Sequence, residues 1–130
     1  MAQSVTGKAP LVVAGFGMNS RADLRSLRAA LMAAQAGGPP VTALAALRDH
    51  AARLHPLAEA MGVALIVLEP ALLRGTATPS QSARSHAVYG TGSVAEACAL
   101  SAAAPARLLS PRATAPDRNA TCAIAERVPQ

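Results

Sequence analysis

Aromatic side chains are almost absent from this chain of 130 residues, which contains one Phe, one Tyr and no Trp. Proteins that bind single-stranded nucleic acid usually stack the bases on aromatic rings, so the composition argues against that class. Hydrophobic residues nevertheless form 52% of the sequence, which is enough for the core of one domain. That core must consist of closely packed Ala, Val, Leu and Ile.

The sequence also has few side chains that could form a metal site or a disulfide framework. The two cysteines, Cys98 and Cys122, fit no CxxC pattern and are expected to be small buried hydrophobic residues. His50 and His55 are five residues apart, which places them on different faces of a helix, and no carboxylate cluster accompanies them. We therefore expect no metal and no cofactor, and interpret the histidines as structural or surface residues.

Runs of like charge and long apolar runs are missing as well. The net charge of +5 and the pI near 10.6 predict attraction to anions. However, the arginines are scattered singly between Arg21 and Arg127 and form no basic arm for DNA, whereas a small polyanion needs only a few of them to converge. No apolar run approaches transmembrane length, and we recognise no secretion signal. We expect a cytoplasmic protein that binds neither nucleic acid nor membrane.

Short apolar runs indicate the strands. Leu11–Phe16 is a continuous apolar run that predicts a strand buried on both faces, and Val63–Leu68 is the clearest buried strand of the sequence. The segment Val41–Leu47 fits either a strand or the start of a helix. Residues 106–110 and 120–125 predict two terminal strands that are joined by a proline-rich and charged loop without an obvious helix.

Helices are predicted between these strands from their end residues. A capping box at Ser20 and Asp23 starts the first helix. Gly62 ends the second helix, and Pro56 should lie near its first turn. A third helix should run from Pro79 to Val88 before a glycine turn interrupts it.

The alternation of strands and helices predicts a three-layer α/β/α domain. Its sheet should contain about five strands and be mostly parallel, and antiparallel pairing of the last two strands would make it mixed. We expect this single domain to cover residues 11–130 and residues 1–10 to form a flexible tail.

The segment GTGSVAEA, Gly90–Ala97, places two glycines and a serine before an alanine-rich run. Ser93 and Glu96 have the spacing of a capping box, so the segment can be explained as a helix start. The same segment would gather free N–H groups at a helix N-terminus, where phosphate or carboxylate binds. Gly15 and Gly17, at the end of the first strand, pose a similar choice between a tight turn and a ligand-facing corner. We expect both segments to lie at the same edge of the sheet.

Four motifs in order resemble one known family. VVAGFGMNSRAD, LAEAMGVAL, GTGSVAEACAL and LLSPRATAPDRNATCAIAERV are similar to the cobalamin biosynthesis protein CobE and to the C-terminal domain of CbiG. The resemblance extends from Leu11 to Val128, and GTGSVAEA is its strongest motif. It implies a stand-alone α/β protein of the corrin ring pathway.

The sequence departs from this family at its first loop. The family usually has Gly-x-Gly-Cys-Arg there, whereas Met18 and Asn19 stand at the cysteine and arginine positions of this chain. Arg21 is the nearest residue that could supply the missing charge. The resemblance assigns the family's two later basic positions to Arg48 and Arg112.

The resemblance implies that the protein binds a carboxylate-rich corrin or precorrin intermediate, as a carrier or accessory protein that could also meet other enzymes of the pathway. The alternative is hydrolysis of a precorrin lactone or acyl group, as in CbiG. The residues provide no nucleophile and base pair for it, so we assign no catalytic residue. The expected ligand-binding residues are Gly15, Gly17, Arg21, Arg48, Gly90, Thr91, Gly92, Ser93 and Arg112.

Overall fold

The computed structural model describes residues 11–129, and the predicted tail of residues 1–10 lies outside them. The strands are β2 (Val12–Met18), β3 (Ala43–Leu47), β4 (Ala64–Leu68), β5 (Ala106–Thr114) and β6 (Ala120–Arg127). They form one sheet in the order β4-β3-β2-β6-β5. β3 is parallel to β2 and to β4, whereas β6 is antiparallel to β2 and to β5. The sheet is therefore mixed, because the two C-terminal strands form a hairpin.

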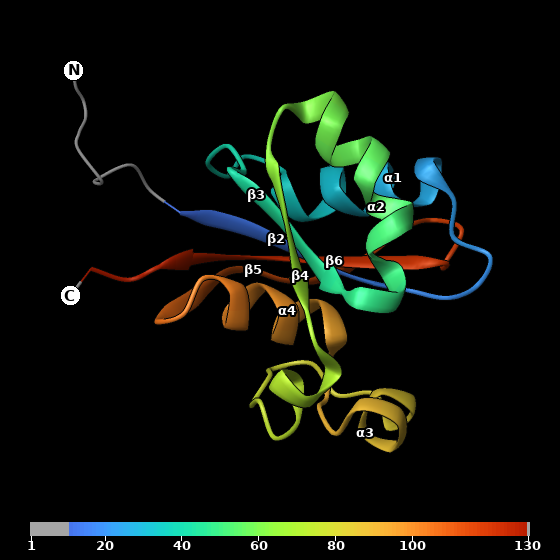
Figure 1. The fold of residues 1–130 in the computed structure, drawn as a ribbon, viewed down its shortest axis with the longest axis vertical. Helices are drawn as coiled ribbons and strands as arrows, with labels where there is room; N and C mark the ends of the chain where they lie inside the picture. Colours follow the sequence, from blue (N-terminus) through green and yellow to red (C-terminus); the bar gives the residue numbers. More distant parts are fainter. Residues whose placement is uncertain (1–10, 130) are drawn as a thin grey trace.

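The helices are α1 (Leu24–Gln35), α2 (Arg48–Met61), the 3-10 turn η1 (Pro70–Leu73), α3 (Ala83–Tyr89) and α4 (Val94–Ala102). α1 and α2 cover one face of the sheet and α4 covers the other, which confirms the predicted three-layer α/β/α fold (Figure 1). α3 lies against η1 beyond the sheet and buries none of its own residues. None of the helices within residues 11–129 is long and apolar enough to cross a membrane.

The central strand β2 is buried on both faces, which explains why its sequence is a continuous apolar run. Val12, Ala14 and Phe16 belong to the core beneath α1 and α2. Val13 belongs to the second core, on the side of α4. Successive side chains of a strand point to opposite faces, so this one strand serves both cores.

The second helix follows β3 directly. Residues 43–47, which fitted either a strand or a helix start, form the fully buried strand β3. α2 ends at Gly62, as predicted, because this residue takes a left-handed conformation with a φ of 68°. Pro56 lies inside the helix and not near its first turn, because α2 begins as early as Arg48.

The prediction that Val63–Leu68 is the clearest buried strand is wrong. β4 lies at the edge of the sheet, and of its five residues only Leu68 is buried. An apolar run alone does not distinguish a central strand from an edge strand, because strand order depends on connections far along the chain.

Two helix starts differ from their predictions. α1 is capped by Asp23, which accepts from the N–H of Ser26 at 3.0 Å, because residues 19–22 form a separate turn ahead of the helix. α3 begins four residues later than predicted and is capped by Ser82, because residues 78–81 form a loop with its own hydrogen bonds. β5 also extends beyond the predicted residues 106–110, through register irregularities, to Thr114.

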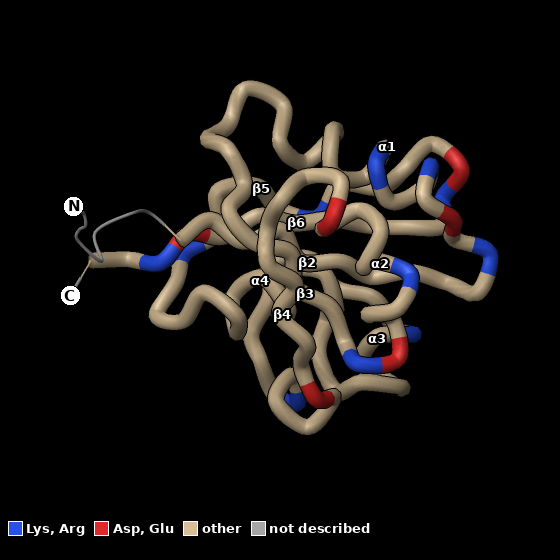
Figure 2. The backbone as a smooth tube through the Cα atoms, turned by 45° about the horizontal axis from the view of Figure 1, so that its top comes forward, with Lys and Arg blue, Asp and Glu red and all other residues tan. Residues whose placement is uncertain are grey.

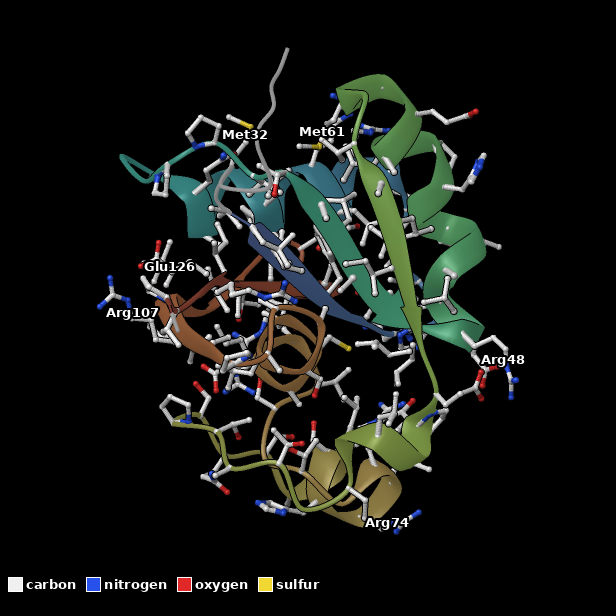
Figure 3. The ribbon with its side chains drawn as sticks, turned by 60° about the vertical axis from the view of Figure 1, so that its left-hand side comes forward. Met32, Arg48, Met61, Arg74, Arg107 and Glu126 are labelled. Carbon is white, nitrogen blue, oxygen red and sulfur yellow. The ribbon has the colours of Figure 1, made fainter. Side chains whose placement is uncertain are left out.

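Basic and acidic residues are interspersed over the backbone and do not form a single basic stripe (Figure 2). Arg48 pairs with Glu69 at 3.0 Å, and Arg107 pairs with Glu126 at 2.6 Å. These two exposed pairs lie toward opposite edges of the sheet. Figure 3 shows Arg48 near the end of β4 and Arg107 beside Glu126 on the hairpin.

Gly15 of β2 allows α4 to approach the sheet closely. A Cβ atom at this position would lie 2.3 Å from the carbonyl oxygen of Ala95 and 2.4 Å from the backbone nitrogen of Ala99. Both obstacles are backbone atoms of α4, so the helix itself would have to move. Gly15 is thus a packing residue, and the position of α4 depends on its lack of a side chain.

We predict that Gly15→Ala lowers the free energy of unfolding by about 3 kcal/mol or more, because the added methyl group displaces α4. Chemical denaturation measures the change. Gly38→Ala is the matched control, since its Cβ would meet one atom at 3.4 Å, and it should change stability by less than about 0.5 kcal/mol. Equal effects of the two substitutions would contradict this account of the packing.

Candidate functional site

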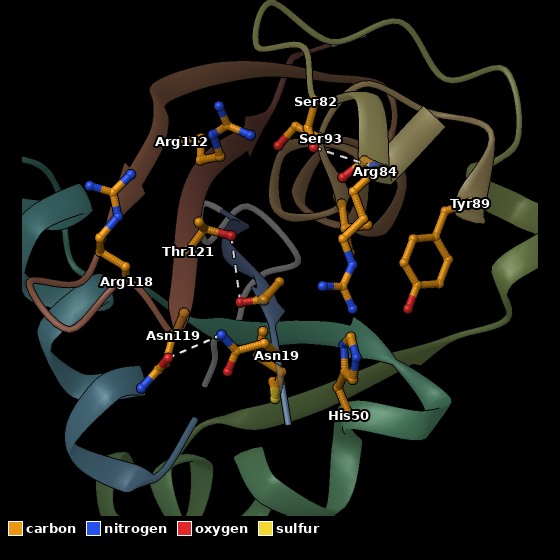
Figure 4. Close-up of a pocket in the computed structure, with 15 residues that line it drawn as sticks. Asn19, His50, Ser82, Arg84, Tyr89, Ser93, Arg112, Arg118, Asn119 and Thr121 are labelled. Carbon is orange, nitrogen blue, oxygen red and sulfur yellow. Dashed lines mark hydrogen bonds between the residues drawn. The ribbon is translucent and has the colours of Figure 1, made fainter. Parts of the chain in front are cut away.

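A cavity of about 280 Å³ opens at the carboxyl end of β2, between the β5–β6 hairpin and α3 (Figure 4). Open α/β sheets bind ligands in this position, outside the carboxyl ends of their parallel strands. The lining residues come from the end of β2, the first turns of α2 and α4, α3 and the hairpin. They include Asn19, His50, Arg84, Tyr89, Ser93, Arg112, Arg118 and Thr121.

The starts of α2 and α4 lie at the wall of the cavity. α2 follows Leu47, whose side chain provides no hydrogen-bond acceptor for the first-turn N–H groups. α4 begins after Ser93, whose hydroxyl accepts from the N–H of Glu96 at 3.3 Å. A helix N-terminus carries a partial positive charge, so both helices favour an anion in the cavity.

Three arginines from different elements line the cavity, namely Arg84 on α3, Arg112 on β5 and Arg118 in the hairpin turn (Figure 4). None of them forms an ion pair with a carboxylate of residues 11–129, and no carboxylate of that part lines the cavity. An anionic ligand would therefore meet cations that the protein itself does not neutralise. Guanidinium groups bind carboxylates through charge-assisted and often bidentate hydrogen bonds.

Arg118 stands in a left-handed backbone conformation with a φ of 65°. Its N–H donates to the carbonyl of Ala115 at 2.8 Å, which closes the hairpin turn. Asp117 next to it accepts from the Ser26 hydroxyl at 2.5 Å and from the N–H of Asn119 at 2.9 Å, and these bonds lower the pKa of Asp117. A left-handed conformation costs a residue other than glycine about 1 kcal/mol or more. The hydrogen bonds of the turn therefore hold Arg118 in a backbone conformation that it would not favour by itself.

Asn19 joins the end of β2 to the same turn. Its backbone N–H donates to the carbonyl of Asn119, and its side-chain amide donates to the side-chain oxygen of Asn119, each at 3.0 Å. Arg53 of α2 donates to the carbonyl of Asn19 at 2.6 Å. Asn19 therefore fixes the relative positions of three parts of the cavity wall: β2, α2 and the hairpin.

Glu96 of α4 is completely buried beneath the cavity wall. Its carboxylate accepts from the N–H of Ser80 at 2.9 Å, the hydroxyl of Ser80 at 2.7 Å and the N–H of Arg112 at 2.8 Å. Its own N–H is bound by Ser93, but its side chain does not return to that residue as a capping box would require. Glu96 thus connects α4 to the loop before α3 and to the strand that carries Arg112.

The sequence matches the family model described as cobalamin synthesis G C-terminus over residues 12–125. The chain belongs to this family. Membership covers nearly all the described residues, including both helix starts and the hairpin turn at the cavity. No match was found among curated proteins.

Two solved structures resemble this member of the CbiG C-terminal family. CobE, a protein from the cobalamin (vitamin B12) biosynthetic pathway, is 27% identical with a TM-score of 0.80, over 94% of each chain. A putative cobalamin biosynthesis protein G homolog from Sulfolobus solfataricus is 14% identical with a TM-score of 0.66 and shows a similar fold. That match covers 91% of this chain and 37% of the Sulfolobus chain.

The structure brings three of the residues expected from the family resemblance to one cavity. Gly17, Ser93 and Arg112 all line it, so the end of the first strand and the glycine-serine turn share one edge of the sheet. Of these, Ser93 caps α4 through its hydroxyl, and its further role as a ligand contact stays a prediction.

The other expected residues lie outside the cavity lining. Gly15 packs against α4, and Arg48 pairs with Glu69 in solvent. Arg21 is exposed in the turn before α1 and does not line the cavity.

The rest of the glycine turn connects α3 to neighbouring segments. Gly90 ends α3 in a left-handed conformation with a φ of 72°. The buried hydroxyl of Thr91 donates to the carbonyl of Thr76 at 2.8 Å. A Cβ at Gly92 would lie 2.6 Å from the carbonyl oxygen of Ser80, so its lack of a side chain serves close packing.

Sequence reasoning missed most of the cavity. Asn19, Arg84, Arg118 and Asn119 were not expected at the site, and His50 was interpreted as structural or exposed. The signal that could have found Arg118 and Asn119 is the Pro-Asp-Arg-Asn sequence between two predicted strands, since it is typical of a tight turn.

The two cysteines are buried and free, as predicted. Burial raises the pKa of the Cys98 thiol to about 12 and also raises the pKa of Cys122. Neither thiol lines the cavity. No group of three metal-binding side chains was found within residues 11–129.

We predict that Glu96→Gln lowers the free energy of unfolding by about 1–3 kcal/mol, because the amide group supplies one acceptor where three N–H and O–H donors converge. Thermal unfolding measures this change. Glu59→Gln is the matched control, because the Glu59 carboxylate is exposed on α2 and pairs with His55 at 3.5 Å. If both variants unfold like the wild-type protein, the buried carboxylate does not hold these segments together.

Proposed function

We propose that this protein binds a carboxylate-rich corrin or precorrin intermediate of cobalamin biosynthesis, as a carrier or accessory protein. The observation that carries the proposal is that Arg84, Arg112 and Arg118 line one cavity, each without a carboxylate partner in the described part of the chain. A corrin intermediate carries several acetate and propionate arms, which complement these cations. Membership of a cobalamin synthesis family supports this choice among polyanions.

The size of the cavity supports binding through the acid arms. Its volume of about 280 Å³ lies near the lower limit of ligand pockets. A whole tetrapyrrole is larger than this space, so the arms along one edge would enter it while the macrocycle covers its mouth. The two helix N-termini would then add to the field of the arginines where the carboxylates end.

The hydrogen bonds of the site favour binding over hydrolysis. Ser82 and Ser93 line the cavity, but each hydroxyl accepts from a backbone N–H as a helix cap. Within residues 11–129, no serine or threonine hydroxyl is hydrogen-bonded to a histidine. A serine or threonine nucleophile activated by histidine is therefore not assembled there.

The first test is titration with two corrins that differ only in their arms. We predict a saturable shift of the visible absorption bands with cobyrinic acid, whose arms end in free carboxylates, and no shift with its fully amidated counterpart. Mass spectrometry of the recovered corrin should show it unchanged. A changed mass would support hydrolysis and contradict the carrier role. Equal binding of both corrins would contradict recognition of the carboxylates by the arginines.

We predict that Arg112→Ala weakens binding of cobyrinic acid by roughly 10- to 150-fold, as expected for a lost charge-assisted hydrogen bond. Isothermal titration measures the dissociation constant. Arg28→Ala removes the same charge from an exposed position of α1 outside the cavity and serves as the control. A similar loss in both variants would indicate that net charge, and not this site, attracts the ligand.

We predict that Arg118→Gly lowers affinity for the ligand without lowering the stability of the protein. Glycine accepts the left-handed conformation without strain, so the free energy of unfolding should stay unchanged or rise by about 1 kcal/mol. Affinity for cobyrinic acid should fall nonetheless, because the guanidinium group is lost. Undiminished affinity in this variant would remove Arg118 from the proposed site.

A further inference from the structure

His50 lies at the inner wall of the cavity, in the first turn of α2. Its side chain is exposed to only 8%, although it borders an open cavity. In Figure 4 its ring lies below Arg84 and beside Asn19, on the opposite side of the space from Arg112. His50 therefore stands where the innermost part of a ligand would end.

The two nitrogens of the His50 ring have different surroundings. Nδ1 is enclosed by protein and has no hydrogen-bond partner among residues 11–129. Nε2 is not enclosed in this way, so it is the ring nitrogen that the cavity can reach. An enclosed N–H without an acceptor is rarer and more costly than an acceptor without a donor. The favoured neutral form therefore carries its hydrogen on Nε2.

The charges around His50 also favour the neutral form. Arg53 and Asp49 act on it from α2, and the first lowers its pKa while the second raises it. Burial is the largest influence, and the pKa of His50 lies below its ordinary value. Of the three arginines that line the same cavity, Arg84 lies nearest to the ring in Figure 4, whereas Arg112 and Arg118 lie on the hairpin side.

We propose that His50 is a specificity residue that donates a hydrogen bond from Nε2–H, as a neutral imidazole, to a carboxylate at the inner end of the cavity. This inference rests on the proposed function and extends it from the arginines to a neutral donor. His50 and the three arginines, Arg84, Arg112 and Arg118, then each present a hydrogen-bond donor to the ligand. A carboxylate can accept through either oxygen, whereas a carboxamide can accept only through its C=O, and its N–H₂ group finds no acceptor on His50.

Three substitutions test the bond to His50. His50→Gln can present an amide N–H near the former Nε2 and should bind cobyrinic acid within about threefold of the wild-type affinity. His50→Leu lacks a donor, and His50→Asn ends short of the Nε2 position, so both should bind roughly tenfold more weakly. Wild-type affinity in His50→Leu would overturn the proposal. Equal losses in the Gln and Leu variants would also overturn it, because the donor would then not explain the effect.

A second measurement reports on the ring without relying on a corrin. Nitrogen-15 NMR of labelled histidine should show the neutral Nε2–H form in the free protein, and mellitate, a benzene ring with carboxylates, should shift Nε2 more than Nδ1. An Nδ1–H form or a charged ring in the complex would overturn the proposal. If mellitate produces the expected shift but cobyrinic acid does not bind, the proposed function fails and the role of His50 stands.

Discussion

The cavity depends on one buried carboxylate. Glu96 reaches the backbone of Ser80 on one side and of Arg112 on the other, so a single side chain sets the distance between the loop before α3 and the strand β5. Three donors within 2.9 Å satisfy a charge that would otherwise be unfavourable at full burial. The position of Glu96 depends in turn on Gly15, because that residue lets α4 lie close to β2.

In the cavity, the groups that hold the walls together differ from the charged groups that line the space. Backbone and amide bonds, such as those of Asn19 to Asn119, fix the frame. The guanidinium groups of Arg84, Arg112 and Arg118 stay without carboxylate partners in the described residues. In the proposed function, this separation would keep the guanidinium groups available to the ligand while the walls that carry them are already held in place, and such preorganisation reduces the entropy lost on binding.

Local features of the fold could be predicted from sequence, whereas features that depend on strand order could not. The end of α2 at Gly62 follows from a short-range preference of glycine, and it was predicted correctly. The edge position of β4 and the approach of Asn19 to Asn119 depend on pairings between distant segments. The hairpin side of the cavity was missed for this reason, since the pairing of β2 with β6 places Thr121 opposite Gly17.

The wall formed by α3 differs from the rest of the cavity in how it is attached. Because α3 buries none of its residues fully, and Tyr89 is its one residue that packs against a core, separating it from the body would expose little apolar surface apart from that ring. The fully buried residues of the two cores include none from α3, so only the contact of Tyr89 would be lost in such a movement. Backbone amides of residues 83–89 should therefore exchange with solvent much faster than those of β2, on a pathway of local opening that leaves the global unfolding equilibrium unchanged.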